Sequence, residues 1–248
     1  MDTRGTALVT GASGGIGIAV CRRLAGLGVP LVVAYRSKRP ASLIEELGQL
    51  VVHSGQFDLT EAADVARFVV DAEVAAGDIR TVVHAAGPHV PMVHLSKVAP
   101  EAFADQVAQD AAGFFNLVRA VLPGLRRTRG SLTVVTTAAT RRYPVRDGLS
   151  AAPKGAVEAL ARAFAAEEGR YGVRVNCVGP GMLDDGMSAR LMASGELDER
   201  ALAVARSNIP LRTFGNSRDI AEAVEYLSSD RASFVTGQKL DVDGGYGI

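Results

Sequence analysis

A run of glycines near the start of the chain has the composition of a phosphate-binding turn. Residues 10–17 read T-G-A-S-G-G-I-G, between a short apolar run and a segment with helical spacing. Glycines let backbone N–H groups approach a phosphate closely, and the N-terminus of the following helix adds partial positive charge. The turn therefore predicts a pyrophosphate site. The residues expected to form it are Gly11, Ser13, Gly14, Gly15, Ile16 and Gly17.

A basic segment after the second apolar run bears on which dinucleotide this turn would hold. Residues 34–39 read A-Y-R-S-K-R, with no carboxylate among them. An acidic residue here would hydrogen-bond a ribose 2′-hydroxyl and select NAD. Arg36 and Ser37 instead suit a ribose 2′-phosphate, because a guanidinium pairs with two phosphate oxygens at once. We therefore expect NADP(H) as the cofactor, the alternative being that the segment is a solvated surface loop.

The elements that would position these residues alternate along the chain. Strands are expected at Thr6–Thr10, Leu31–Tyr35, Leu50–His53, Thr81–His84, Leu132–Thr136, Val173–Val178 and Lys239–Val242. Helices are expected notably at Ile16–Leu27, Glu61–Ala75, Glu101–Leu122, Ala151–Glu168 and Arg218–Leu227. Apolar strands separated by helices indicate a parallel sheet covered on both faces. Right-handed crossovers then predict a doubly wound, Rossmann-type α/β fold of seven parallel strands.

Length and composition fit one domain spanning residues 1–248, since 248 residues with 48% hydrophobic content can bury a large core. Residues 183–208 break the alternation and predict a helical insertion that faces the substrate. The 27 basic and 27 acidic residues balance, which argues against nucleic acid or a membrane surface as the main partner. We find no signal peptide, and Cys21 and Cys177 have no metal-site spacing, so we expect a cytoplasmic protein with reduced thiols and no bound metal.

The spacing G-x-x-x-G-x-G, preceded by threonine, resembles that of the short-chain dehydrogenase/reductases. The resemblance extends along the chain through F-D-L-T at 57–60, H-A-A-G at 84–87, N-C-V-G-P-G at 176–181 and D-G-G at 243–245. The pattern is most similar to that of bacterial 3-oxoacyl-[acyl-carrier-protein] reductases. It implies further cofactor contacts from Asp58, Leu59, Ala85, Ala86, Gly87, Lys154, Pro180 and Gly181.

The catalytic positions that the resemblance implies depart from the family's pattern. The family uses a tyrosine as proton donor, a lysine four residues later, a serine about 13 residues earlier and an asparagine in the preceding helix. These positions hold Ser150, Lys154, Thr137 and Asp110 in this chain. Thr137 keeps a hydroxyl and Asp110 is able to pair with Lys154, but a serine hydroxyl is a far weaker acid than a phenol. Asp185 is a further departure, because the family often has threonine there.

Several other groups are candidates for the missing proton donor. Lys154 lies four residues after Ser150 on the same helical face, so it would act through that hydroxyl or through a water. Tyr143, His89 and His94 lie in loops expected near the cleft, where ordinary loop roles are the alternative. Ser150 also has a structural alternative as the N-cap of its helix, which would put Pro153 at the third helical position.

We therefore expect NADPH-dependent reduction of a ketone, similar to 3-oxoacyl thioester reduction, on a substrate that is free or bound to a carrier protein. The alternative is a catalytically inactive cofactor-binding homologue that acts as a sensor or as the partner subunit of an active reductase. The family resemblance also implies a homo-oligomer, a tetramer or dimer. Five arginines would either dock an acidic carrier or lie solvated at the surface: Arg126, Arg127, Arg129, Arg141 and Arg142.

Overall fold

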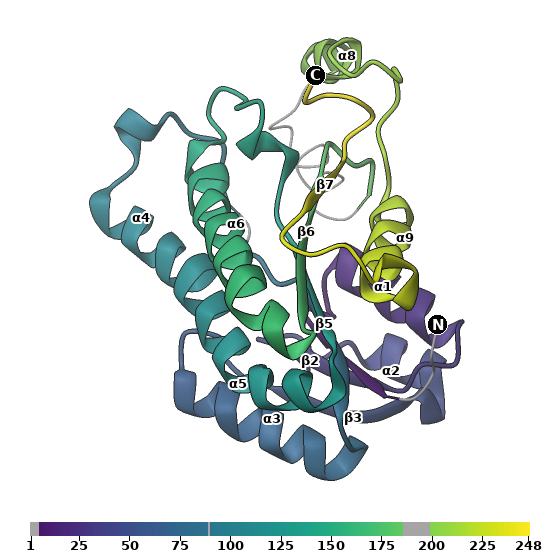
Figure 1. Ribbon diagram of the computed structural model, residues 1–248. Helices are drawn as coiled ribbons and strands as arrows, with labels where there is room; N and C mark the ends of the chain where they lie inside the picture. The colour runs from purple at the N-terminus through teal and green to yellow at the C-terminus, as the bar shows by residue number, and fades with distance from the viewer. Residues whose placement is uncertain (1–4, 89, 186–198) are drawn as a thin grey trace.

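The central feature of the fold is a parallel sheet at the middle of the molecule (Figure 1). The computed structural model describes residues 5–88, 90–185 and 199–248. Within them, seven strands pair in the order β3-β2-β1-β4-β5-β6-β7, and every pair is parallel. The strands are β1 Thr6–Thr10, β2 Leu31–Tyr35, β3 Val51–Gln56, β4 Ile79–His84, β5 Ser131–Val135, β6 Arg174–Pro180 and β7 Lys239–Val242. This confirms the expected doubly wound α/β fold.

Helices cover both faces of the sheet (Figure 1). One face carries α1 Gly15–Ala25, α2 Ala41–Leu47 and α9 Ser217–Ser228, and the other carries α3 Ala62–Ala76, α5 Gly113–Thr128 and α6 Gly148–Glu168. Successive strand residues point to opposite faces. Leu8 accordingly packs in the core beneath α3, α5 and α6, whereas Ala7 and Val9 pack in the core beneath α1, α2 and α9.

The helix expected over Glu101–Leu122 is interrupted. It consists of α4 Pro100–Val107, one π-helical turn at Ala108–Ala112, and α5, which runs on to Thr128. A π turn inserts one extra residue into a helix and is frequent at functional sites. It turns Asp110 into the protein interior, where this side chain is buried.

The helix α6 begins three residues earlier than the sequence indicated. Its N-cap is Asp147 and its first residue is Gly148, so Ser150 lies within the first turn and Pro153 lies inside the helix. The N-cap role for Ser150 is therefore wrong. That alternative assumed that Pro153 lies near the helix start, but the helix begins further towards the N-terminus, at Gly148.

The strand order reverses between β1 and β4, because the chain winds away from β1 towards β2 and β3 before it returns. Parallel strands end at one common edge, and ligands of this fold bind in the crevice at such a switch point. The glycine turn follows β1, and residues 85–88 follow β4. The fold thus brings both segments to the same crevice.

The segment expected as an insertion at 183–208 is described only in part. Leu183 forms a parallel bridge with Gly215, and α8 spans Glu199–Ser207. Residues 186–198 lie outside the described residues, so the substrate-facing role of the insertion stays a prediction. No helix among the described residues is both long and apolar enough to span a bilayer. These residues also contain no group of three or more His, Cys, Asp or Glu side chains placed to hold a metal ion.

Candidate functional site

A cavity of about 350 Å³ opens at the switch point, lined by the glycine turn and by the carboxyl ends of β1, β2, β3 and β4. Gly11 adopts φ +73°, and a Cβ there would lie 2.5 Å from the backbone nitrogen of Ala86. A Cβ at Gly17 would lie 2.2 Å from the carbonyl oxygen of Gly11. The turn therefore packs against the β4 loop and against α1 so closely that only glycine fits at these two positions.

Most of the expected cofactor residues surround this cavity. Its lining includes Gly11, Ser13, Gly14, Gly15, Arg36, Ser37, Asp58, Leu59, Ala85, Ala86 and Gly87. Ile16, Gly17 and Lys154 are not part of the lining, and Pro180 and Gly181 line a second cavity. Further lining residues that were not expected as cofactor contacts include Lys38, Thr60, Pro88 and Gln109. The contacts themselves stay a prediction.

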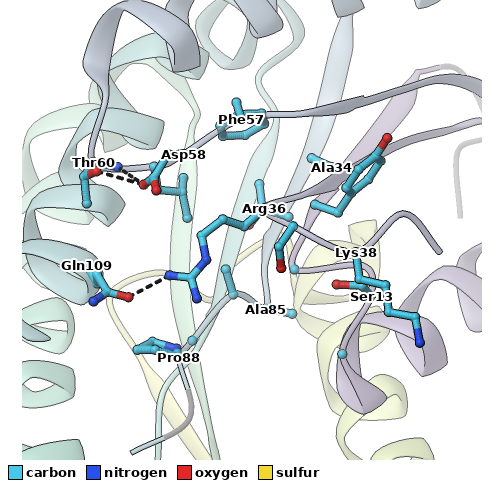
Figure 2. A pocket seen from close by; sticks show the side chains of 18 of the residues that line it. Ser13, Ala34, Arg36, Lys38, Phe57, Asp58, Thr60, Ala85, Pro88 and Gln109 are labelled. Atoms are coloured by element: carbon cyan, nitrogen blue, oxygen red, sulfur yellow. Dashed lines mark hydrogen bonds between the residues drawn. The ribbon is translucent and has the colours of Figure 1, made fainter.

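Arg36 extends from the end of β2 across this cavity towards the π turn (Figure 2). Its Nη1 donates a hydrogen bond of 2.7 Å to Oε1 of Gln109. In the segment that follows β3, Asp58 accepts from the backbone N–H and hydroxyl of Thr60 at 2.9 and 2.8 Å. These two bonds lower the pKa of Asp58, and the Arg36 charge adds to the effect. Asp58 is thus held as an acceptor beside a guanidinium that faces the cavity.

Lys154 and Asp110 form a buried ion pair next to this cavity. The Nζ of Lys154 lies 2.7 Å from Oδ1 of Asp110 and 3.4 Å from the carbonyl oxygen of Ala86. The other carboxylate oxygen of Asp110 accepts a 2.6 Å hydrogen bond from Gln106. The pairing anticipated from the sequence is therefore present. It fixes the lysine ammonium under the β4 loop, whose Ala86 and Gly87 line the cavity.

His84 is a further buried polar residue near Lys154, and no role was predicted for its side chain. It ends β4 and is 1% exposed, and its Nδ1 lies 2.8 Å from the hydroxyl of Thr10. Burial lowers the pKa of His84 to about 3, and the nearby Lys154 charge adds to the shift. The imidazole is therefore neutral at physiological pH. Its place directly before the A-A-G segment was the available signal, because side chains at strand ends face the crevice.

A second cavity, of about 700 Å³, lies at the carboxyl ends of β5, β6 and β7. Thr137, Pro180 and Gly181 are among the residues that line it. The Thr137 hydroxyl oxygen accepts a 3.1 Å hydrogen bond from the Ala139 backbone N–H, which leaves the hydroxyl hydrogen available to donate. Much of the wall is apolar. The apolar lining residues include Met92, Val145, Met182, Val204 and Ile209.

The candidates for the missing proton donor do not gather in this second cavity. Ser150 lines neither cavity, and its side chain makes no hydrogen bond with the described residues. Tyr143 is 59% exposed and His94 is exposed, and neither lines a cavity. His89 lies outside the described residues. The carboxylic acid that does line the second cavity is Asp147, which lies before the helix start expected at Ala151 and was not a candidate.

Asp185 has a structural role at the start of α9. Its carboxylate accepts from the backbone N–H of Ser217 at 3.0 and 3.1 Å and from the Ser217 hydroxyl at 2.9 Å. These bonds satisfy the Ser217 N–H, one of the N–H groups that the first helical turn leaves without a partner in the helix. Asp185 therefore acts as a cap and lines neither cavity.

Most of the arginines considered for carrier docking are engaged within the chain. Arg126 pairs with Glu168 through two bonds of 2.6 and 2.7 Å, and Arg127 bridges Glu73 and Asp78. Arg141 lies 3.5 Å from Asp241, and Arg142 stacks over Tyr246. These contacts favour the surface alternative over a dedicated docking patch.

The residues present fit a dinucleotide. The first cavity combines a glycine turn at a helix N-terminus, a hydrogen-bonded carboxylate just after β3 and a guanidinium at the end of β2. The first of these suits a pyrophosphate, and the other two suit the polar groups of a nucleoside. The Pro180–Gly181 turn lines the larger, mainly apolar second cavity together with Thr137.

Comparisons with known proteins agree with this geometry. Residues 11–247 match the model of the family described as enoyl-(acyl carrier protein) reductase. The chain is 31% identical to L-fucose dehydrogenase of Oryctolagus cuniculus, covering 96% of this chain and 83% of that one. It is also 31% identical to the 3-oxoacyl-[acyl-carrier-protein] reductase FabG of Staphylococcus aureus strain Mu50, with 97% of each chain covered.

A solved structure extends the similarity to three dimensions. The 3-ketoacyl-(acyl-carrier-protein) reductase from Brucella melitensis complexed with NADH matches with a TM-score of 0.89 at 26% identity, over 99% of both chains. The glycine turn, the strand order and these matches agree, and the chain belongs to the short-chain dehydrogenase/reductase family of oxidoreductases.

Proposed function

We propose that this protein is an NADPH-dependent carbonyl reductase that reduces a 3-oxoacyl thioester or a similar ketone. The observation that carries the proposal is the pair of cavities at one edge of the sheet. One has the features of a dinucleotide site, and the other is a mainly apolar space whose lining includes Thr137. An apolar wall suits an acyl chain better than it suits a sugar, whose hydroxyls need polar partners.

Different residues of this chain would bind the cofactor and orient the substrate. Arg36 and Ser37 would hold a ribose 2′-phosphate, and the amides of the glycine turn would hold the pyrophosphate. Thr137 would donate a hydrogen bond to the carbonyl oxygen, which polarises the carbonyl for attack. A bound nicotinamide would supply the hydride. Lys154 is tied to Asp110, so we assign it to the shape and charge of the cofactor site and not to direct proton transfer.

Substrate-dependent oxidation of NADPH, followed at 340 nm, tests this function. The panel contains 3-oxoacyl thioesters of increasing chain length, activated ketones, and L-fucose with NAD⁺ or NADP⁺ in the reverse direction. We expect reduction of oxoacyl thioesters with a KM that falls as the chain lengthens. Faster oxidation of L-fucose than reduction of any thioester would contradict the proposed substrate class.

A second candidate function follows from the altered catalytic positions. Ser150 lines neither cavity and Lys154 is committed to an ion pair, which favours a cofactor-binding homologue without turnover. Such a protein would act as a sensor or as a partner subunit. NADPH binding by calorimetry, combined with no turnover anywhere in the panel, would select this second function.

A further inference from the structure

The lining of the second cavity includes one carboxyl group, that of Asp147, which has no polar partner among the described residues. Asp147 is the N-cap residue of α6, but its side chain accepts no hydrogen bond from the helix backbone. Among the described residues it has no hydrogen-bond or ion-pair partner, although it is only partly exposed. An N-cap aspartate normally bonds the second or third free N–H of its helix. This one lines the cavity together with Thr137 and the Pro180–Gly181 turn.

The backbone around Asp147 is held in an unusual conformation. The preceding residue, Arg146, has φ +77°, which is uncommon for a residue with a Cβ. Its guanidinium donates two hydrogen bonds, of 3.0 and 2.7 Å, to the carbonyl oxygen of Met92 in the neighbouring loop. Gly148, on the other side, is packed so closely that a Cβ would lie 2.6 Å from the Leu95 side chain. Backbone strain of this kind gathers at functional sites, and these contacts fix the place of Asp147.

We propose that the Asp147 carboxyl donates the proton that completes carbonyl reduction, in place of the tyrosine that Ser150 replaces. This assignment rests on the proposed reductase function. The carbonyl carbon gains two electrons and a hydrogen as hydride from a reduced nicotinamide dinucleotide, which is oxidised. The carbonyl oxygen then takes the proton of Asp147 to give the alcohol. The carboxylate left behind regains a proton from water, because Asp147 remains partly exposed.

The surroundings of Asp147 suit this task. Burial raises the pKa of Asp147 to about 6, so part of the population is protonated near neutral pH. The other charged or titratable groups in the lining are Arg200 of α8 and Tyr246 near the C-terminus. Arg146, the adjacent residue, has its guanidinium turned to Met92. The Thr137 hydroxyl in the same cavity would hold the substrate oxygen while Asp147 protonates it.

The substitution Asp147→Asn tests the proposal, because asparagine keeps the shape of the side chain but has no acidic proton. We expect kcat to fall about 10²- to 10⁴-fold while the KM and the NADPH dissociation constant change little. The wild-type rate should decline as pH rises above about 6, and this limb should be absent in the variant. Asp71→Asn is the matched control, since Asp71 is exposed on α3 and lines neither cavity.

A readout that needs no turnover accompanies the kinetics. In protein carrying ¹³C-labelled aspartate carboxyls, we expect one resonance that titrates near pH 6 and vanishes in Asp147→Asn. Unchanged kcat and pH profile in the variant, with an active wild type, would overturn the Asp147 role and leave the reductase function standing. A wild type that turns over nothing in the panel would overturn both.

Discussion

At the scale of single residues, the buried pair of Lys154 and Asp110 distinguishes this chain from the catalytic pattern of its family, which has asparagine at the position of Asp110. An asparagine would leave the lysine charge to be balanced by other groups, whereas Asp110 neutralises it directly at 2.7 Å. The side chains are 11% and 2% exposed, so water contributes little to their solvation. Removing one partner of such a pair leaves the other charge buried and unpaired.

Lys154→Met and Asp110→Asn should each lower the free energy of unfolding by about 3–5 kcal/mol, because each leaves one buried charge unpaired. The double variant should lose less unfolding free energy than the two single variants together, since it leaves no unpaired charge in the interior. Urea denaturation of all four proteins completes the cycle. Additive losses would mean that the two groups do not stabilise each other.

Arg36 is the residue on which the cofactor preference depends. Arg36→Ala should raise the NADPH dissociation constant at least tenfold, about 1.4 kcal/mol, and leave the NADH value within about twofold. The reason is that only NADPH carries the 2′-phosphate that the guanidinium would pair with. Calorimetric titration measures both constants. Arg39→Ala is the control, since Arg39 is exposed but does not line the cavity. Equal losses for both cofactors would refute a selective role for Arg36.

At the scale of elements, the start of α9 is fixed by two sets of caps. Asn216 and Asp219 form a reciprocal capping box, and Asp185 reaches the same turn from the segment after β6. Through Asp185, α9 holds the chain that leaves the Pro180–Gly181 turn. The element that packs on α1 thus also anchors one wall of the second cavity.

Asp185→Ala should lower the free energy of unfolding by about 1 kcal/mol, the usual cost of losing a helix cap. NADPH binding should be unchanged, because Asp185 lines neither cavity. Thermal and urea denaturation give the stability, and Asp184→Ala serves as the control because its side chain is exposed. A loss of cofactor affinity without a loss of stability would place Asp185 at the nicotinamide after all.

The helices and strands show how much of the fold could be predicted from the sequence. Apolar runs and the glycine turn predicted all seven strands within a few residues, because strand burial and turn geometry are local properties. The π turn was missed, because residues 101–122 were predicted as one continuous helix. The start of α6 was missed because Asp147 caps nothing and Pro153 favoured a later start. The burial of His84 beside Thr10 and the place of Asp147 in the second cavity depend on segments distant in sequence, which the local pattern does not describe.

At the scale of the whole molecule, two groups with shifted pKa values oppose each other in the dependence of stability on pH. The folded state holds His84 neutral with a pKa of about 3, below the ordinary value of 6.5, so its stabilising effect is lost as pH falls. Asp147 has its pKa raised from 3.8 to about 6, so its effect grows as pH falls through that range. Between about pH 6 and 4 the two effects partly cancel.

His84→Asn should therefore flatten the fall in stability below pH 6.5, by at most about 1.4 kcal/mol per pH unit. Asp147→Asn should steepen the same fall, because it removes the opposing contribution. Urea denaturation at a series of pH values between 4 and 8 measures both. Identical pH profiles for wild type and His84→Asn would mean that the imidazole titrates normally in the folded state.

The assembly state is a further property of the whole molecule and stays a prediction. Phe103 and Phe115 are 40% and 43% exposed on α4 and α5, and Phe115 stacks on Phe164 of α6. Aromatic groups at the surface of these helices are compatible with the expected homo-oligomer. Light scattering coupled to size-exclusion chromatography would give the mass in solution.

The order of the strands has a practical consequence. Segments after β1, β2, β3 and β4 surround the first cavity, whereas most of the second is built from segments that follow β5, β6 and β7. The two halves of the chain thus carry separable tasks, with a boundary near residue 130. We expect that replacing residues 181–215 with those of a relative changes which compounds the protein accepts. The ratio of its affinities for NADPH and NADH should stay the same.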